Sequence, residues 1–339
     1  MSQVLSADAA MARAIECARL GLGKTHPNPI VGSVITSANG EFISEGFHQG
    51  TDHAEVVAIN GAKKIPAGAI IYITLEPCNH QGKTPPCTQA IIAAGIKKVL
   101  YAVSDPNPIA SGGGEYLRAS GIEVESGLLE SEAAFDNRAW LSKIAKQRPR
   151  ITWKIASTMD GKVAAADGTS KWITSELARA DVAVLRSQSD AIVTSTATVK
   201  ADNPLLTSKG VGKNPVRIVM GRSEIASGSQ ILNADSETVA IKSRDLQELI
   251  TLAKARGFNQ LLIESGPTFG TALMKAGLID EVILYQAPTF FGSGTPSISD
   301  LGVATISERL DFEIADVEVI GADLKITLIK SANQEEGGR

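Results

Sequence analysis

The feature that most constrains this fold is a set of four residues, His53, Glu55, Cys78 and Cys87, whose side chains suit a metal site. His53 and Glu55 begin one predicted helix, and the Gly/Pro-rich loop between Cys78 and Cys87 runs into another. Two helix N-termini would then converge on one point, where their positive ends stabilise thiolates. The fold therefore has to bring together segments that are separated in the sequence.

The ligand types identify the metal and the chemistry. Zinc binds imidazole nitrogen and thiolate sulfur, and a catalytic site with three protein ligands keeps its fourth position for water. Zinc lowers the pKa of that water toward ~7. Glu55 is then not a ligand, and we expect it to pass a proton to a departing amine. The motif predicts hydrolytic deamination, with His53, Cys78 and Cys87 as zinc ligands and Glu55 as the catalytic residue.

A purely structural zinc site is the alternative interpretation. Such a site would need a fourth ligand, which His80 could supply, but Glu55 would then have no purpose beside His53. The third cysteine, Cys17, falls in the apolar pattern of the first predicted helix and is interpreted as core packing.

Length and charge limit the classes of protein. A chain of 339 residues predicts two domains of ordinary size. The net charge is −4 and no Lys/Arg block dominates, which argues against binding to a polynucleotide backbone. No apolar run approaches the ~20 residues of a membrane helix, and the N-terminus lacks a signal-peptide pattern. We expect a cytoplasmic protein without nucleic-acid or membrane partners.

A polar, proline-bearing junction at residues 147–150 divides the chain, and strand-like and helix-like runs alternate on both sides of it. We predict two α/β domains, residues 1–147 and 148–332, and a disordered tail at 333–339. Residues 132–146 are expected to form one helix, and Gly112, Gly113 and Gly114 a flexible turn. The last predicted strand covers residues 281–287.

The His-x-Glu and Pro-Cys motifs are similar to those of the zinc-dependent cytidine-deaminase-like superfamily. Cys78 and Cys87 are nine positions apart instead of three, and residues 74–87 resemble the deaminase of riboflavin biosynthesis, as do the loops at 27–32 and 105–108. The resemblance implies a three-layer α/β/α domain, with a contact to the substrate base at Asn28. His48 lies five residues before His53 and is also expected to contact the substrate. Judged by residue type alone, Asn28 could also be an Asx-turn residue.

The second half resembles the NADPH-dependent reductase of riboflavin biosynthesis, which has a dihydrofolate-reductase-like α/β fold. Residues 154–162, 170–175 and 194–207 carry this resemblance. Taken alone, the strand and Gly266-Pro267 turn at 262–270 could be a phosphate-binding helix start or an ordinary connection. With both halves matching in order, the chain is identified as a member of the bifunctional deaminase/reductase family.

The resemblance also implies residue roles in the reductase. The implied NADPH contacts are Ala156, Trp172, Thr198, Asp202, Gly266, Pro267, Thr268, Phe269, Gly270, Thr271 and Ala272. The implied substrate contacts are Ser170, Arg186, Leu206, Lys209 and Glu264. Lys209 stands where the family is expected to have arginine, and it offers a point charge instead of a bidentate fork. The catalytic residue stays open among Lys154, Asp202 and Glu264.

Two successive reactions on small phosphorylated pyrimidines follow from the resemblance. Zinc-dependent deamination of 2,5-diamino-6-ribosylamino-4(3H)-pyrimidinone 5′-phosphate would precede NADPH reduction of 5-amino-6-(5-phosphoribosylamino)uracil to the ribityl phosphate. A homo-oligomer, dimer or tetramer, formed through the C-terminal domain is implied as well. The alternatives are a nucleic-acid-acting zinc deaminase with an accessory binding domain, and a non-catalytic scaffold stabilised by zinc.

Overall fold

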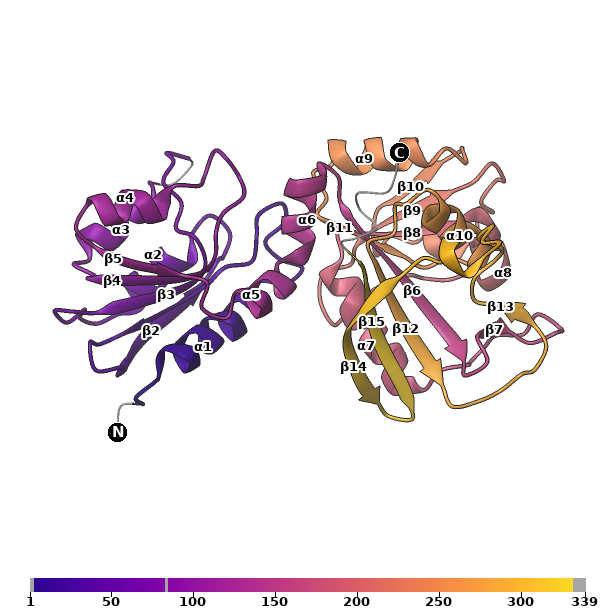
Figure 1. Cartoon of the computed structure of the whole chain (residues 1–339). Helices are drawn as coiled ribbons and strands as arrows, with labels where there is room; N and C mark the ends of the chain where they lie inside the picture. The colour runs from indigo at the N-terminus through magenta and orange to yellow at the C-terminus, as the bar shows by residue number, and fades with distance from the viewer. Residues whose placement is uncertain (1–2, 83–84, 332–339) are drawn as a thin grey trace. The chain divides into compact units, whose positions relative to one another are not determined.

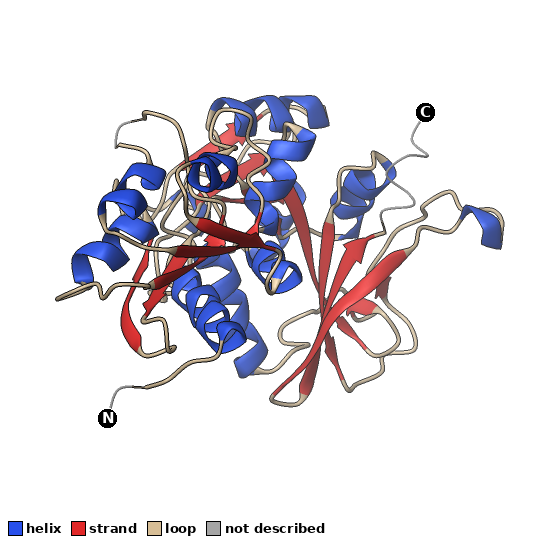
Figure 2. Ribbon diagram, turned by 60° about the vertical axis from the view of Figure 1, so that its left-hand side comes forward, coloured by secondary structure: helices blue, strands red, loops and turns tan. Residues whose placement is uncertain are grey.

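The computed structural model describes residues 3–82 and 85–331. Contacts divide the chain into two units, Met1–Gln147 and Arg148–Arg339. Both units combine a β-sheet with helices (Figures 1 and 2). The tail expected at 333–339 lies outside the described residues. Within the described residues, every helix falls short of the length and hydrophobicity that a membrane span requires.

The first unit contains one mixed sheet and its helices. Its elements are α1 (Ala7–Arg19), β1 (Gly32–Thr36), β2 (Phe42–Phe47), α2 (Ala54–Gly61), β3 (Ile70–Leu75), α3 (Cys87–Ala93), β4 (Lys98–Val103), α4 (Gly113–Ala119), β5 (Glu123–Ser126), α5 (Glu130–Asp136) and α6 (Arg138–Lys146). The strand order is β2-β1-β3-β4-β5. β1 runs antiparallel to β2 and β3, whereas β3, β4 and β5 are parallel.

Helices cover both faces of this sheet because its central strands are apolar on both sides. Met11 of α1 and Trp140 of α6 pack on one face beside Val34. Ile91 of α3 and Leu117 of α4 belong to the core on the other face. Figure 1 shows α1 and α5 on one side of the sheet and α3 and α4 on the other. The predicted three-layer α/β/α fold is confirmed.

Two local predictions in this unit are wrong. The helix expected at 132–146 is divided at Asn137, whose side chain donates to the Ile30 carbonyl oxygen at 2.6 Å and accepts from the Ile30 N–H at 3.1 Å. The glycine run is not a flexible turn. Gly112 caps α4 with a left-handed φ of 87°, and Gly113 and Gly114 are buried in the first turn of that helix.

The second unit is built on a larger sheet. Its elements are β6 (Arg150–Thr158), β7 (Lys162–Ala164), α7 (Glu176–Gln188), β8 (Ala191–Ser195), α8 (Thr196–Asp202), β9 (Val216–Met220), η1 (Gln230–Leu232), β10 (Thr238–Ile241), α9 (Leu246–Ala255), β11 (Gln260–Ile263), α10 (Pro267–Lys275), β12 (Glu281–Ala287), β13 (Thr295–Pro296), η2 (Ile306–Glu308), β14 (Phe312–Ile320) and β15 (Asp323–Lys330). The sheet order is β10-β9-β8-β11-β6-β12-β15-β14. The strands from β10 to β12 are parallel, and β15 and β14 complete the sheet by antiparallel pairing.

This sheet also has a core on each face. Leu249 of α9 and Leu273 of α10 pack with Trp153 on one face. Val182 of α7 and Val199 of α8 pack with β-strand residues on the other. The predicted α/β architecture is confirmed. The carboxyl ends of β6, β8 and β11 lie at one edge of the sheet, which is where ligand sites form in parallel α/β folds.

Gly32→Ala should destabilise the first unit, because β1 passes α1 at backbone contact there. A Cβ at Gly32 would lie 1.9 Å from the Ala14 carbonyl oxygen and 2.7 Å from the Ala18 nitrogen. Backbone atoms cannot move aside as a flexible side chain can, so we expect a loss of about 1–3 kcal/mol in the free energy of unfolding. Urea denaturation of the full chain would measure it.

Gly61→Ala is the matched control, since the nearest atom to its new Cβ would be 3.8 Å away. Equal stability of the two variants would contradict the close approach of β1 to α1.

Candidate active sites

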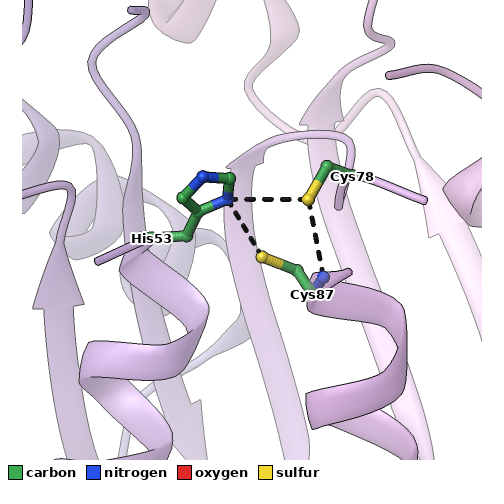
Figure 3. Close-up of side chains that lie close together, drawn as sticks. All are labelled: His53, Cys78 and Cys87. Carbon is green, nitrogen blue, oxygen red and sulfur yellow. Dashed lines mark hydrogen bonds between the residues drawn. The ribbon is translucent and has the colours of Figure 1, made fainter. Parts of the chain in front are cut away.

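His53, Cys78 and Cys87 meet at one point of the first unit (Figure 3). His53 is the N-cap residue of α2, Cys87 is the first residue of α3, and Cys78 follows β3. His53 Nδ1 lies 3.1 Å from Cys87 Sγ and 3.5 Å from Cys78 Sγ. Ligand atoms around a tetrahedral zinc ion are separated by roughly 3.5 Å, so these three donors fit such an ion.

His80 does not join this group. Among the described residues, the side chains whose ligand atoms all lie within 4.8 Å of one another here are His53, Cys78 and Cys87. A structural site with His80 as the fourth ligand therefore has no support in the geometry.

Burial and hydrogen bonds shift the acidity of the groups at this point. Glu55 is 3% exposed in the first turn of α2, and burial raises its pKa to about 7. A hydrogen bond with the Cys87 thiol lowers the pKa of Cys78, and a hydrogen bond with Cys78 raises the pKa of His53. Glu55 can accordingly accept and release a proton near neutral pH, as a general acid/base must.

A cavity of about 330 Å³ opens beside the ligand group. Asn28 and His48 both line it, with Asn28 Nδ2 3.2 Å from His48 Nε2. The His48 ring also meets the His53 ring edge-on at 5.5 Å, and burial lowers the pKa of His48. The volume suits a small molecule. The structure thus brings both predicted substrate contacts to the ligand group.

Four polar side chains that line this cavity have no role predicted from the sequence: Thr51, Glu76, Asp105 and Asn107. Glu76 is buried directly after the apolar strand β3, two residues before Cys78. That position, a carboxylate between a buried strand and a metal ligand, is the signal that could have identified it. Burial raises the pKa of Asp105, with Glu76 and Cys78 as further causes.

In the second unit, a buried charge cluster joins three of the predicted residues. Arg186 binds Glu264 through two hydrogen bonds of 2.6 and 2.9 Å, and Lys154 Nζ lies 3.7 Å from Glu264 Oε2. Burial opposes the charge of Glu264, but Arg186 and Lys154 overcome it and lower the pKa of Glu264 to about 2. Burial lowers the pKa of Lys154. Glu264 is therefore ionised at neutral pH.

A hydroxyl cluster lies where β8 and β11 end. Thr198 Oγ1 is 3.0 Å from Ser195 Oγ and 3.2 Å from Ser265 Oγ, and it accepts a 3.3 Å hydrogen bond from the Gly266 N–H. Gly266 begins α10 without a side-chain cap, and a Cβ there would have no neighbour within 4 Å. The N–H groups of Thr268 and Phe269, in the first turn of α10, have no acceptor within the helix, and such groups at a helix start suit a cofactor phosphate.

Residues 266–272 were predicted to contact NADPH, but several of the later residues in this range face the core. Phe269 packs against the core, and a Cβ at Gly270 would lie 2.1 Å from Trp153 ring atoms. Thr271 is buried and accepts a hydrogen bond from the Ser299 N–H. The first residues of this range are consequently the best candidates for contact with a cofactor.

Of the other predicted contacts, Ala156 lies in β6 and Asp202 ends α8, and the rest lie on connections. Leu206 and Lys209 have left-handed φ angles of 50° and 51°, and Arg186 donates to the Thr207 carbonyl oxygen between them. Lys171 Nζ donates to the Asp202 carbonyl oxygen. Trp172 is 69% exposed, with the Arg179 guanidinium 4.7 Å from its ring centre. Ala156 packs against a core cluster, and Ser170 is half-buried.

Two protein families match the chain in order. Residues 5–103 match the cytidine and deoxycytidylate deaminase zinc-binding region. Residues 149–326 match the RibD C-terminal domain. The first match contains the ligand group, and the second contains the charge cluster and the hydroxyl cluster.

Similar proteins are known over nearly the full length. Riboflavin biosynthesis protein RibD of Mycobacterium tuberculosis (strain ATCC 25618 / H37Rv) is 42% identical, across 97% of this chain and 99% of the relative. The Escherichia coli (strain K12) protein of the same name is 37% identical, across 94% and 98%.

Solved structures agree. One from Thermotoga maritima, described as a diaminohydroxyphosphoribosylaminopyrimidine deaminase/5-amino-6-(5-phosphoribosylamino)uracil reductase, is 33% identical, with a TM-score of 0.88 over 96% of this chain and 98% of its own. Acinetobacter baumannii RibD, form 1, is 36% identical, with a TM-score of 0.86 over the same shares.

Cys78→Ala should lower the zinc content of the purified protein, because two ligands hold the ion far less tightly than three. We expect at least a 10-fold loss of zinc affinity, measured by elemental analysis after dialysis against a chelator. Cys17→Ala is the control, since Cys17 is a buried cysteine in α1 outside the ligand group. Equal zinc contents in both variants would refute the ligand set.

Proposed function

The chain belongs to the riboflavin biosynthesis protein RibD family of bifunctional enzymes, and we propose that its two units act in turn on one phosphorylated pyrimidine. The first unit removes an amine from 2,5-diamino-6-ribosylamino-4(3H)-pyrimidinone 5′-phosphate. The second reduces 5-amino-6-(5-phosphoribosylamino)uracil to the ribityl phosphate. The observation that carries this proposal is the meeting of His53, Cys78 and Cys87 beside Glu55 and a small-molecule cavity.

In the deamination, His53, Cys78 and Cys87 would hold zinc. Zinc is a Lewis acid that lowers the pKa of a bound water toward ~7. Glu55, with a pKa of about 7, takes a proton from the attacking water and delivers it to the leaving amine. Asn28 and His48 orient the ring in the cavity beside it.

In the reduction, NADPH supplies the hydride, and the protein holds both reactants in place. Thr198 and the Gly266 turn would bind the cofactor, together with Ala156, Trp172 and Asp202. The proposed substrate contacts are Ser170, Arg186, Leu206, Lys209 and Glu264.

Among the candidates for the reductase catalytic residue, the charge cluster favours Lys154. Glu264 has a pKa of about 2 and is held by Arg186, so it has no proton to give at neutral pH. Asp202 ends α8, and among the described residues the ion pairs of this cluster join Lys154 and Arg186 to Glu264 and leave Asp202 out. The ammonium group of Lys154 lies beside Glu264 and is a proton donor. Burial lowers the pKa of Lys154, which makes release of its proton easier.

We also propose a homo-oligomer, dimer or tetramer, formed through the second unit. β14 is an edge strand of the large sheet, and Ile314, Val317 and Val319 on it are 69%, 53% and 75% exposed. These three pair with Leu328, Ile326 and Leu324 of β15, so the apolar stripe spans two strands. An exposed apolar edge of this length favours pairing with another chain. A second copy would cover it.

The cytoplasmic location stays a proposal as well. Its support is that Cys17, Cys78 and Cys87 are all free and that two of them belong to the ligand group, as is typical of a reducing compartment.

The family matches disfavour both alternative functions, a deaminase that acts on nucleic acid and a non-catalytic scaffold. A nucleic-acid deaminase or a zinc-stabilised scaffold would not account for a second unit that matches the RibD C-terminal domain. Small phosphorylated pyrimidines are therefore the proposed partners.

Glu55→Gln should abolish deamination and leave reduction intact. The amide cannot carry the proton, so we expect the rate of ammonia release to fall by at least ~100-fold. NADPH oxidation with pre-deaminated substrate should be unchanged, since Glu55 lies in the other unit. Ammonia release at the wild-type rate by a variant that retains zinc would contradict the role of Glu55 as the general acid/base.

Val317→Glu should weaken the oligomer by placing a charge in the apolar stripe. Sedimentation velocity should show a shift toward monomer at micromolar concentrations, with a rise in dissociation constant of at least ~10-fold. Val211→Glu is the control, because Val211 is 55% exposed on a connection away from β14. A monomeric wild-type protein would contradict the proposal.

A further inference from the structure

We propose that Glu76 is a positioning residue of the deaminase, which fixes the loop between β4 and α4 against the cavity. The inference rests on the proposed function of the first unit, since it concerns how substrate is held there. Glu76 is 9% exposed and lies at the end of β3. Glu55 is left as the proton carrier, and Glu76 needs no contact with the reacting atoms.

Both carboxylate oxygens of Glu76 accept hydrogen bonds from backbone groups at the two ends of this loop. Oε2 accepts from the Asp105 N–H at 3.1 Å, and Oε1 accepts from the Gly114 N–H at 2.9 Å. The Glu76 N–H in turn donates to the Val103 carbonyl oxygen at 2.8 Å. One side chain thus closes a loop of about ten residues, and loop closure costs entropy that these bonds offset.

The residue type matters because only a carboxylate offers two acceptors in this geometry. No ion pair described in residues 3–82 and 85–331 includes Glu76, so these N–H groups are the partners of its charge. A glutamine would satisfy one N–H and turn an NH₂ donor toward the other. That exchange replaces a charge-assisted hydrogen bond with a contact between two donors.

Backbone packing ties the loop to the metal-ligand segment at the same place. A Cβ at Gly113 would lie 1.8 Å from the Pro77 carbonyl oxygen, so α4 begins in backbone contact with the residue before Cys78. The Asn79 N–H donates to the Ala110 carbonyl oxygen at 3.3 Å. The glycine run was predicted to be flexible, but its close packing against Pro77 instead fixes the end of this loop.

Glu76 would act through two side chains that the loop presents to the cavity, Asp105 and Asn107. The Asp105 carboxylate accepts from the Asn107 N–H at 2.8 Å, so the two are fixed relative to each other. If the ends of the loop loosen, both move relative to the cavity, while His53, Glu55 and Cys87 are held at the starts of α2 and α3. The expected effect is weaker substrate binding more than slower chemistry.

The test is Glu76→Gln in the full-length protein, assayed for ammonia release from the diaminopyrimidine phosphate. We expect KM to rise about 10-fold, with kcat changed less than about 3-fold, as one lost charge-assisted hydrogen bond implies. Zinc content and NADPH oxidation on pre-deaminated substrate should match wild type. Hydrogen exchange measured by mass spectrometry should speed up in peptides covering residues 104–116.

Glu115→Gln is the matched control, since Glu115 lies exposed in the first turn of α4 beside Gly114 and should leave KM and exchange unchanged. Glu76→Asp keeps the charge but is too short for both bonds, so it serves if the glutamine variant folds poorly, and we expect a smaller change in the same direction. Unaltered KM and exchange would overturn the proposal, as would a loss of kcat explained by lost zinc. A wild-type protein that releases no ammonia would instead contradict the proposed function.

Discussion

A buried carboxylate has to be protonated, hydrogen-bonded or paired with a cation, and this constraint assigns different properties to three glutamates of this protein. Glu55 is buried in the first turn of α2, and this burial raises its pKa to about 7. Glu264 is less buried and lies between Arg186 and Lys154, and these two cations lower its pKa to about 2 against the effect of burial. Glu76 is held by two backbone N–H groups. The neighbours of each glutamate are thus the basis for the roles proposed here: proton carrier for Glu55, fixed charge for Glu264 and structural anchor for Glu76.

Glycines allow helices to pack closely on the sheets near Glu55 and Glu264. A Cβ at Gly46 would lie 2.5 Å from the Ala58 nitrogen and 2.6 Å from the Ala54 carbonyl oxygen, so α2 rests directly on β2. This contact holds the start of α2, where His53 and Glu55 lie. In the second unit, Gly270 allows α10 to lie on the side-chain ring of Trp153. Each site thus depends on a helix held tightly against its sheet.

The sequence predicts what depends on neighbours in the chain and misses what depends on distant partners. Alternating helices and strands, and the spacing of His53, Glu55, Cys78 and Cys87, were sufficient for the fold class and for the metal group that the structure assembles. The break at Asn137 depends on Ile30, which is 107 positions away. The anchoring by Glu76 depends on backbone groups 29 and 38 positions away. No strand was predicted after residue 287, so β14 and β15 were missed. The bulge between Ile314 and Asp316 shifts the alternation of apolar and charged residues within β14, and most of this strand is exposed.

The placement of the tryptophans has an optical consequence. The chain has three, and Trp140 and Trp153 are 7% and 1% exposed within the two cores, whereas Trp172 is 69% exposed at the proposed cofactor site. Fluorescence from a solvent-facing indole is quenched by acrylamide, while that from buried rings is protected. A cofactor bound at the proposed site would cover this indole, so acrylamide quenching of Trp172 would report occupancy of the second unit without any added label.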